Sequence, residues 1–176
     1  MKTVWIVDGA YLFNQAKGNK HIDYVKLKNE LEILNEGRIY ESYFLNSSPV
    51  NPNQGQSNFN NWLKSAPPNG PQMRVQIYPL KESSCKCRAC GEISKKYVQK
   101  GVDVGIAVLI LTLAMKDSYD RLILSAGDGD FEDAISHVKT NMGKEVWVNG
   151  GKAGLSVDLQ SYADKVIWLE DLEITK

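Results

Sequence analysis

The stretch from residue 122 to residue 131 constrains the fold of this chain more than any other. A short apolar run ends in small residues, two carboxylates (Asp128 and Asp130) then flank a glycine, and an apolar-periodic segment follows. This order predicts a buried strand, a tight loop and the start of a helix. In an open α/β sheet, ligands bind just beyond the carboxyl ends of the strands. We therefore expect Asp128 and Asp130 to lie at such an edge.

Strand-like and helix-like segments alternate along the rest of the chain. The expected strands are residues 3–7, 39–45, 73–78, 121–125, 145–149 and 165–169. The expected helices are residues 23–34, a short one around 59–63, 101–111, 131–142 and 156–163. Residues 46–57 are rich in Asn, Ser, Pro and Gln, which predicts a loop. The alternation predicts an α/β fold with a mostly parallel central sheet and helices on both faces, and 176 residues fit a single domain.

Two further acidic residues stand next to apolar segments. Asp8 ends the first apolar run, and Asp103 begins the segment 101–111, which is apolar on nearly all sides and is therefore expected to be buried. A carboxylate at the start of a buried helix is costly unless it is capped, paired or bound to a metal. Each acid alone also suits a helix cap. A metal site therefore requires several acids to meet in space, where a cation would relieve their repulsion.

Composition excludes some classes of protein and leaves others open. Lys and Arg number 21 and so do Asp and Glu, so the net charge is zero and any nucleic-acid binding needs a local basic patch. No apolar run approaches the ~20 residues of a membrane span, and the first residues lack the layout of a signal peptide. We expect a cytoplasmic protein with no membrane contact.

The cysteines lie close together in a basic stretch, which we interpret as an insertion at about residues 81–100. They are Cys85, Cys87 and Cys90. Their spacing does not suggest a disulfide framework and favours a reducing compartment. Neighbouring thiolates suit Zn²⁺, but a structural zinc needs a fourth ligand, such as His21, His137, a carboxylate, water or a second chain. A surface turn with free thiols is the open alternative. The basic residues suit phosphate binding, and a solvated loop would have the same composition.

The acidic segments together resemble the NYN domains, PIN-like nuclease relatives that include LabA-type bacterial proteins. The resemblance runs from residue 4 to about residue 169. Its motifs are Ile6-Val7-Asp8-Gly9 with Asn14, Lys100-Gly101-Val102-Asp103-Val104, Ser125-Ala126-Gly127-Asp128-Gly129-Asp130-Phe131, Gly143-Lys144-Glu145-Val146 and Ala163-Asp164. The family pattern usually reads Ser-Gly-Asp-Ser/Gly-Asp-Phe, and Ala126 departs from it.

This resemblance implies a PIN-like three-layer sandwich with a divalent metal centre. Family members are thought to cut RNA with Mg²⁺ or Mn²⁺, hard cations that prefer carboxylate oxygens. The implied ligands are Asp8, Asp103, Asp128 and Asp130. Side chains expected to hold water or substrate nearby are Asn14, Ser125 and Asp133.

The expected function is a metal-dependent ribonuclease acting on single-stranded or structured RNA. A non-catalytic RNA-binding or regulatory module that keeps the acidic site is an open alternative. A DNA nuclease is another, because metal-bound carboxylates do not read the 2′-hydroxyl. A strand-end-aspartate phosphatase is disfavoured because Asp8 lacks a second Asp two residues on. A homodimer is left open. Trp62 can stack on bases, but core packing is its expected use.

Overall fold

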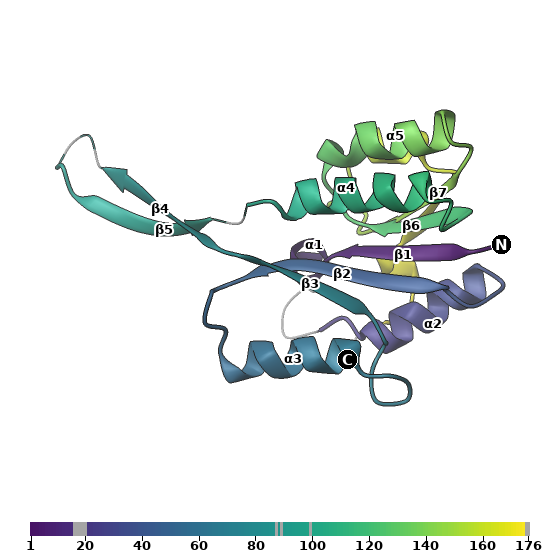
Figure 1. Ribbon diagram of the computed structural model, residues 1–176, viewed down its shortest axis with the longest axis horizontal. Helices are drawn as coiled ribbons and strands as arrows, with labels where there is room; N and C mark the ends of the chain where they lie inside the picture. The colour runs from purple at the N-terminus through teal and green to yellow at the C-terminus, as the bar shows by residue number, and fades with distance from the viewer. Residues whose placement is uncertain (16–20, 87, 89, 99, 175–176) are drawn as a thin grey trace.

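The central feature of the computed structural model is a six-stranded parallel sheet (Figure 1). The structure describes residues 1–15, 21–86, 88, 90–98 and 100–174. The strand order is β3-β2-β1-β6-β7-β8, and every neighbouring pair is parallel. These strands are β1 (Thr3–Asp8), β2 (Glu41–Ser48), β3 (Arg74–Pro79), β6 (Arg121–Ser125), β7 (Glu145–Gly150) and β8 (Lys165–Trp168). The parallel α/β sheet expected from the alternation is confirmed.

Helices cover both faces of the sheet and give three layers (Figure 1). One face carries α1 (Gly9–Gln15), α2 (Tyr24–Leu34) and α3 (Gln54–Lys64). The other carries α4 (Val102–Met115), α5 (Glu132–Thr140) and α6 (Val157–Tyr162), with the short 3-10 turn η1 (Gly129–Phe131). The 3-10 turn η2 (Leu169–Asp171) packs Leu169 into the core of the first face. Successive strand side chains point to opposite faces, so Trp5 and Val7 join one core and Val4 and Ile6 the other.

The polar segment 46–57 is not one continuous loop, so that prediction is wrong. Strand β2 continues to Ser48, and α3 begins at Gln54. Asn53 and Gln56 form a capping box: the Asn53 side chain accepts the Gln56 N–H at 2.8 Å, and the Gln56 side chain accepts the Asn53 N–H at 3.0 Å. The helix lies at the surface with a mostly polar outer side, so its composition resembles that of a loop.

Helix α4 is less buried than its apolar sequence predicts. Val104, Val108 and Met115 are 67%, 54% and 78% exposed, whereas Ile106 and Ile110 are fully buried against the sheet. The helix lies in an outer layer and only one side of it meets the sheet, so the expectation of burial on all sides is wrong. Within the residues that the structure describes, no helix combines the length and apolarity needed to cross a membrane.

The cysteine-containing region forms an antiparallel hairpin of β4 (Lys81–Lys86) and β5 (Ile93–Val98). It projects from the end of the sheet where β3 finishes (Figure 1). Most of its described side chains are polar and exposed, and Ile93 and Tyr97 are exposed as well, so no regular apolar alternation in the sequence predicts these strands. Cys85 and Cys90 are exposed free thiols, and Cys87 lies outside the described residues.

A series of buried hydrogen bonds connects four strands on the face covered by α1 and α2. The Trp5 indole N–H donates to Ser125 Oγ at 2.8 Å, and that hydroxyl donates to Asn149 Oδ1 at 2.8 Å. Asn149 Nδ2 then donates to the main-chain carbonyl of Ile167 at 3.1 Å. Ser125 and Asn149 are fully buried. A buried polar group is costly once its partner is lost, so these bonds favour one alignment of β1, β6, β7 and β8.

We expect Asn149→Ala to lower the free energy of unfolding by about 2–4 kcal/mol, because it leaves the Ser125 hydroxyl without its acceptor and the Ile167 carbonyl without its donor. Urea unfolding followed by circular dichroism measures the change. Asn58→Ala, on the exposed side of α3, is the control and should stay within about 0.5 kcal/mol of wild type. Equal stability of the two variants would show that the buried network contributes little.

Candidate functional site

The candidate site lies where the chain changes direction across the sheet. From β1 the chain proceeds to β2 and β3 on one side, then returns through α4 to β6 on the other. Strands β1 and β6 are neighbours, with Val7 opposite Ser125, so their carboxyl ends are level. In open α/β sheets, the helices diverge at such a switch point and leave a crevice for ligands. Asp8 ends β1, and Asp128 follows β6 by a few residues.

Asp8 is the buried member of this group, with 8% exposure. Its carboxylate accepts the main-chain N–H groups of Ala10 and Tyr11 at 3.0 and 3.2 Å, at the start of α1. Burial raises the pKa of Asp8, and the charges of Asp103 and Asp128 raise it further, against the two N–H bonds that lower it. The site therefore holds a carboxylate in surroundings that oppose its ionisation.

The other three acids surround Asp8 from the opposite face of the sheet. Asp103 lies in the first turn of α4, and partial burial followed by the charges of Asp128 and Asp130 raises its pKa. The Asp128 side chain accepts the Asp130 N–H at 3.1 Å and caps the turn η1. Asp128 and Asp130 are exposed. The structure thus brings each of the four predicted aspartates within electrostatic reach of at least one other: Asp8 interacts with Asp103 and Asp128, and Asp103 interacts with Asp128 and Asp130.

The charge of this cluster is not compensated by the rest of the described chain. None of the four carboxylates forms an ion pair with a Lys or Arg among the described residues. Their oxygens and uncompensated charge fit a hard divalent cation such as Mg²⁺ or Mn²⁺. Their spacing is wider than in a formed metal site, because no group of three or more His, Cys, Asp or Glu in the described part is close enough to hold an ion. Binding an ion would require these side chains to move together.

An open groove of about 440 Å³ extends from the cluster between α4 and α5. Asp103, Asp130 and Asp133 line it, so the structure places the predicted Asp133 beside two of the four aspartates. Glu132 also lines the groove, and the sequence did not predict it as a site residue. An acid in the first turn of a helix is common because it interacts favourably with the helix dipole, so Glu132 gives no separate signal.

A second acid that the sequence did not predict as a site residue is Asp158, at the start of α6. A methyl group added to Gly129 would lie 3.4 Å from its carboxylate, which places Asp158 beside the acidic loop. No spacing in the sequence relates it to the other acids, and only packing of α6 against η1 brings it there.

Close packing fixes the loop that carries Asp128. A Cβ atom on Gly127 would lie 2.1 Å from the ring of Tyr11 and 2.2 Å from the carbonyl oxygen of Gly154, so only glycine fits. The Tyr11 hydroxyl accepts the Gly151 N–H at 3.0 Å, and the Ser156 N–H donates to the Gly127 carbonyl at 2.9 Å. Helix α1, the acidic loop and the loop after β7 therefore hold one another in place.

One of the residues expected to hold water or substrate, Ser125, is not available to the carboxylates. Ser125 is fully buried, and its hydroxyl is engaged by Trp5 and Asn149. That position does not fit contact with a phosphate, so its expected role is corrected to a structural one. Asn14 is exposed on α1, and its expected role stays a prediction.

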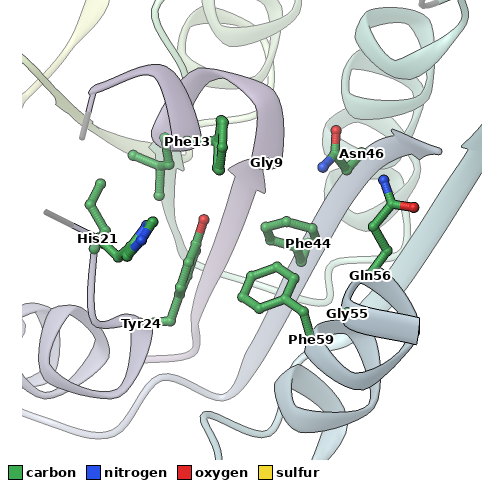
Figure 2. A pocket seen from close by; sticks show the side chains of 11 residues that line it. Gly9, Phe13, His21, Tyr24, Phe44, Asn46, Gly55, Gln56 and Phe59 are labelled. Carbon is green, nitrogen blue, oxygen red and sulfur yellow. The ribbon is translucent and has the colours of Figure 1, made fainter. Parts of the chain in front are cut away.

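The histidines considered as fourth zinc ligands lie away from the hairpin. His21 lines a cavity formed by α1, α2, β2 and α3 (Figure 2). His137 lies on α5, where its ring nitrogen is 2.9 Å from the Asn141 amide nitrogen. Neither is grouped with Cys85 or Cys90 in the part of the chain described.

The cavity that His21 lines was not predicted, and it adjoins the acidic cluster. It measures about 500 Å³, and Gly9, the residue after Asp8, forms part of its wall. Tyr24, Phe44 and Phe59 contribute aromatic rings to it (Figure 2). In the sequence these rings have the spacing and composition of ordinary core residues, so no local signal distinguishes them. Trp62 stacks on Phe59 and packs against the core, as expected.

Comparisons with known proteins bear on the fold and the family. The NYN domain pattern matches residues 2–170. A crystal structure of a Vibrio parahaemolyticus protein of unknown function matches with a TM-score of 0.74 and 21% identity, over 99% of this chain and 96% of that one. This likeness shows the fold alone. The Acinetobacter baumannii MurG structure, at a TM-score of 0.44 and 13% identity over 94% of this chain and 41% of its own, is too dissimilar for any conclusion. Among curated proteins, no sequence matches this chain.

Asp8→Asn should raise the thermal midpoint by about 2–4 °C at pH 7 in EDTA, the equivalent of roughly 1 kcal/mol for a chain of this size. The folded state raises the pKa of Asp8 above its ordinary 3.8, so ionisation at neutral pH costs stability. Asparagine keeps an oxygen for the Ala10 and Tyr11 N–H groups and removes the charge. The gain should shrink as the pH falls through the folded pKa towards 3.8, because wild type then becomes protonated.

The matched control for this prediction is Asp117→Asn, at the amino end of β6. Its carboxylate bonds to Lys144, which lowers its pKa, so its ionised form favours folding and the variant should not gain stability. A lower midpoint for Asp8→Asn than for wild type at pH 7 would contradict the assigned repulsion.

Proposed function

This chain belongs to the NYN domain family, which has a PIN-like nuclease fold, and we propose that it is a metal-dependent ribonuclease hydrolysing RNA phosphodiester bonds. One observation carries the proposal. Four carboxylates, each repelled by at least one of the others, gather at the switch point of a parallel sheet without a cationic partner among the described residues. Such an arrangement costs stability, and a bound divalent cation is the ordinary compensation for that cost.

We assign Asp8, Asp103 and Asp128 as ligands of Mg²⁺ or Mn²⁺, and Asp130 as a ligand bound directly or through water. When bound, the ion supplies a Lewis acid that activates water and neutralises charge on the phosphate. In hydrolysis the water oxygen bonds to phosphorus, the bond to the leaving oxygen breaks, and the water's protons pass to that oxygen and to solvent.

The chain itself positions these groups. The two N–H bonds from α1 fix the orientation of Asp8, and the Gly127 contacts fix the loop that presents Asp128. Asp133 and Glu132 extend the acidic groove from the cluster and would orient water there. The backbone around Asp8 and Asp128 is therefore held in place, and only side-chain movements are needed to close the site around an ion.

RNA would need a positive surface near this acidic edge, because the carboxylates repel phosphates. The hairpin β4–β5 leaves the same end of the sheet (Figure 1), and Lys81 and Arg88 on it are exposed. Lys100 is exposed just before α4. Contacts from these residues to backbone phosphates would give affinity without base specificity, and they provide the local patch that a chain of zero net charge requires.

A non-catalytic RNA-binding module is the second candidate function. The observation that favours it is the spacing of the carboxylates, which form no ready metal-binding group within the described residues. In this alternative, the basic residues of the hairpin bind RNA, and the acids take no part in cleavage.

We also propose that the hairpin cysteines hold Zn²⁺, with the fourth ligand a water or a group from a second chain. Cys85 and Cys90 are exposed near the tip of the hairpin, where β4 turns back to β5. Protein purified without chelator should contain about one zinc per chain, and the Cys85→Ser, Cys90→Ser variant should contain far less, measured by mass spectrometry of the metals. Equal zinc content in the two proteins, or none in wild type, would contradict this site.

Asp128→Asn should reduce RNA cleavage by about a hundredfold or more, because losing even an outer partner of a metal site costs 10–100-fold. The assay uses end-labelled single-stranded RNA and DNA of the same sequence, with Mg²⁺, Mn²⁺ or EDTA. Asp117→Asn, at the opposite edge of the sheet, is the matched control and should cut like wild type.

The outcomes separate the candidate functions. Metal-dependent cutting that Asp128→Asn removes and Asp117→Asn keeps would support the ribonuclease. RNA binding by folded wild type without cutting of any substrate would favour the binding module. Equal cutting of DNA would show that the site does not read the 2′-hydroxyl.

A further inference from the structure

We propose that the aromatic cavity beside Asp8 binds a single unpaired RNA base, and that it favours bases carrying carbonyl groups, such as uracil. The inference rests on the proposed function, since it assigns a base subsite to the same RNA. The cavity has a volume of about 500 Å³, which lies within the range of small-molecule pockets.

The cavity lies next to the acidic cluster. Gly9 in its wall directly follows Asp8, and the Tyr24 ring in the cavity lies close enough for the Asp8 charge to raise the pKa of its hydroxyl, although burial is the larger cause. Figure 2 shows the Tyr24 ring extending towards the Gly9 end of the cavity. A base held here would therefore place its own sugar and phosphate near the carboxyl end of β1.

Aromatic rings provide a stacking surface. Phe44 is 1% exposed and lies deep in the cavity, whereas Phe59 is 37% exposed at its rim, with ring centroids 6.0 Å apart. Tyr24 packs edge-on against both, at 5.7 and 5.8 Å. Bases of single-stranded RNA stack on aromatic side chains of this kind, and any base has the required flat face.

Two amide side chains, Asn46 and Gln56, line the same cavity (Figure 2). Their oxygens are already used: Asn46 Oδ1 accepts the Ser47 N–H at 2.8 Å, and Gln56 Oε1 accepts the Asn53 N–H at 3.0 Å. Their NH₂ groups have no acceptor among the described residues. Amide nitrogens donate only, so this part of the cavity suits an acceptor such as a base carbonyl oxygen.

A smaller cavity of about 60 Å³ shares Asn46, Gln56 and Phe59 with the first. Ser48 lines it, is 6% exposed, and has a hydroxyl with no hydrogen-bond partner in the described part of the chain. An unpartnered buried hydroxyl is costly, and a polar ligand edge or water in this cavity would satisfy it. The region behind the two amides is therefore polar and incompletely satisfied.

The lining favours a neutral ligand over a charged one. No Lys, Arg, Asp or Glu lines the cavity among the described residues, and His21 and Tyr24 are its titratable groups. A phosphate or a charged peptide side chain would find no opposite charge. A purely apolar side chain from a protein partner would leave the two amides without acceptors. A nucleobase satisfies both the rings and the amides.

The test measures binding in EDTA, so that it does not depend on cleavage. Fluorescence anisotropy compares labelled uridine and adenosine pentamers on wild type and on two variants. Phe59→Leu removes the ring and keeps an apolar side chain, and it should weaken both pentamers about tenfold. Gln56→Glu keeps the oxygen that caps α3 and removes the NH₂ group, and it should lower the ratio of uridine to adenosine affinity severalfold.

Each variant has a matched control. Tyr40→Leu removes an exposed ring at the amino end of β2, far from the cavity, and should bind like wild type. Gln54→Glu adds the same charge to the same helical turn as Gln56→Glu but lines no part of the cavity, so it should leave the uridine-to-adenosine ratio unchanged. Circular dichroism spectra and melting curves check that all variants are folded.

The outcomes distinguish the two proposals. If wild type cuts RNA while Phe59→Leu and Gln56→Glu bind both pentamers like wild type, the base subsite is wrong and the ribonuclease stands. If wild type binds with the expected dependence on Phe59 and Gln56 but cuts nothing, the subsite stands and the catalytic proposal falls. If folded wild type neither binds nor cuts RNA, both fall, and an apolar partner becomes the occupant to test.

Discussion

The parallel pairing of β1 with β6 is the constraint on which the rest of this structure depends. These strands are far apart in the sequence, and the chain that separates them forms β2, β3, the hairpin and α4. Because parallel strands end at the same edge, the pairing brings Asp8 and the loop of Asp128 together, and the return through α4 adds Asp103. The acidic cluster is therefore a consequence of topology, and any change of strand order would disperse it.

The cluster and the structure beneath it have opposite energetic effects. Burial and the charges of neighbouring carboxylates raise the pKa of Asp8 and of Asp103, so the site opposes folding when no cation is bound. Immediately below, the hydrogen bonds from Trp5 through Ser125 and Asn149 join four strands in a fully buried layer. Functional sites commonly retain such unfavourable groups because the surrounding structure holds them in place. Here strand β6 contributes to both: Ser125 at its end joins the buried hydrogen bonds, and the loop that follows it carries Asp128.

Three chemically different surfaces meet at this edge. The carboxylates suit a divalent ion, the exposed Lys81 and Arg88 of the hairpin suit phosphates, and the rings of Phe44 and Phe59 suit a flat neutral group. Single-stranded RNA presents a phosphate and a flat neutral base at every nucleotide. The proposed function gives each surface a role. Each surface acts locally, so RNA binding does not need a positive net charge, and the net charge of this chain is zero.

The sequence by itself determined the parallel α/β sheet and singled out the four aspartates as candidates, because strand ends, helix starts and acids next to them can be recognised from short stretches of sequence. It predicted only the second half of α3 and did not predict the hairpin, because much of both has the polar composition of a loop, and it overestimated the burial of α4. Tertiary structure alone decided that Ser125 faces the core, that Glu132 and Asp158 adjoin the site, and that Phe59 lines a cavity. These are properties of contacts between segments distant in the chain, and residue type and spacing do not encode which segments meet.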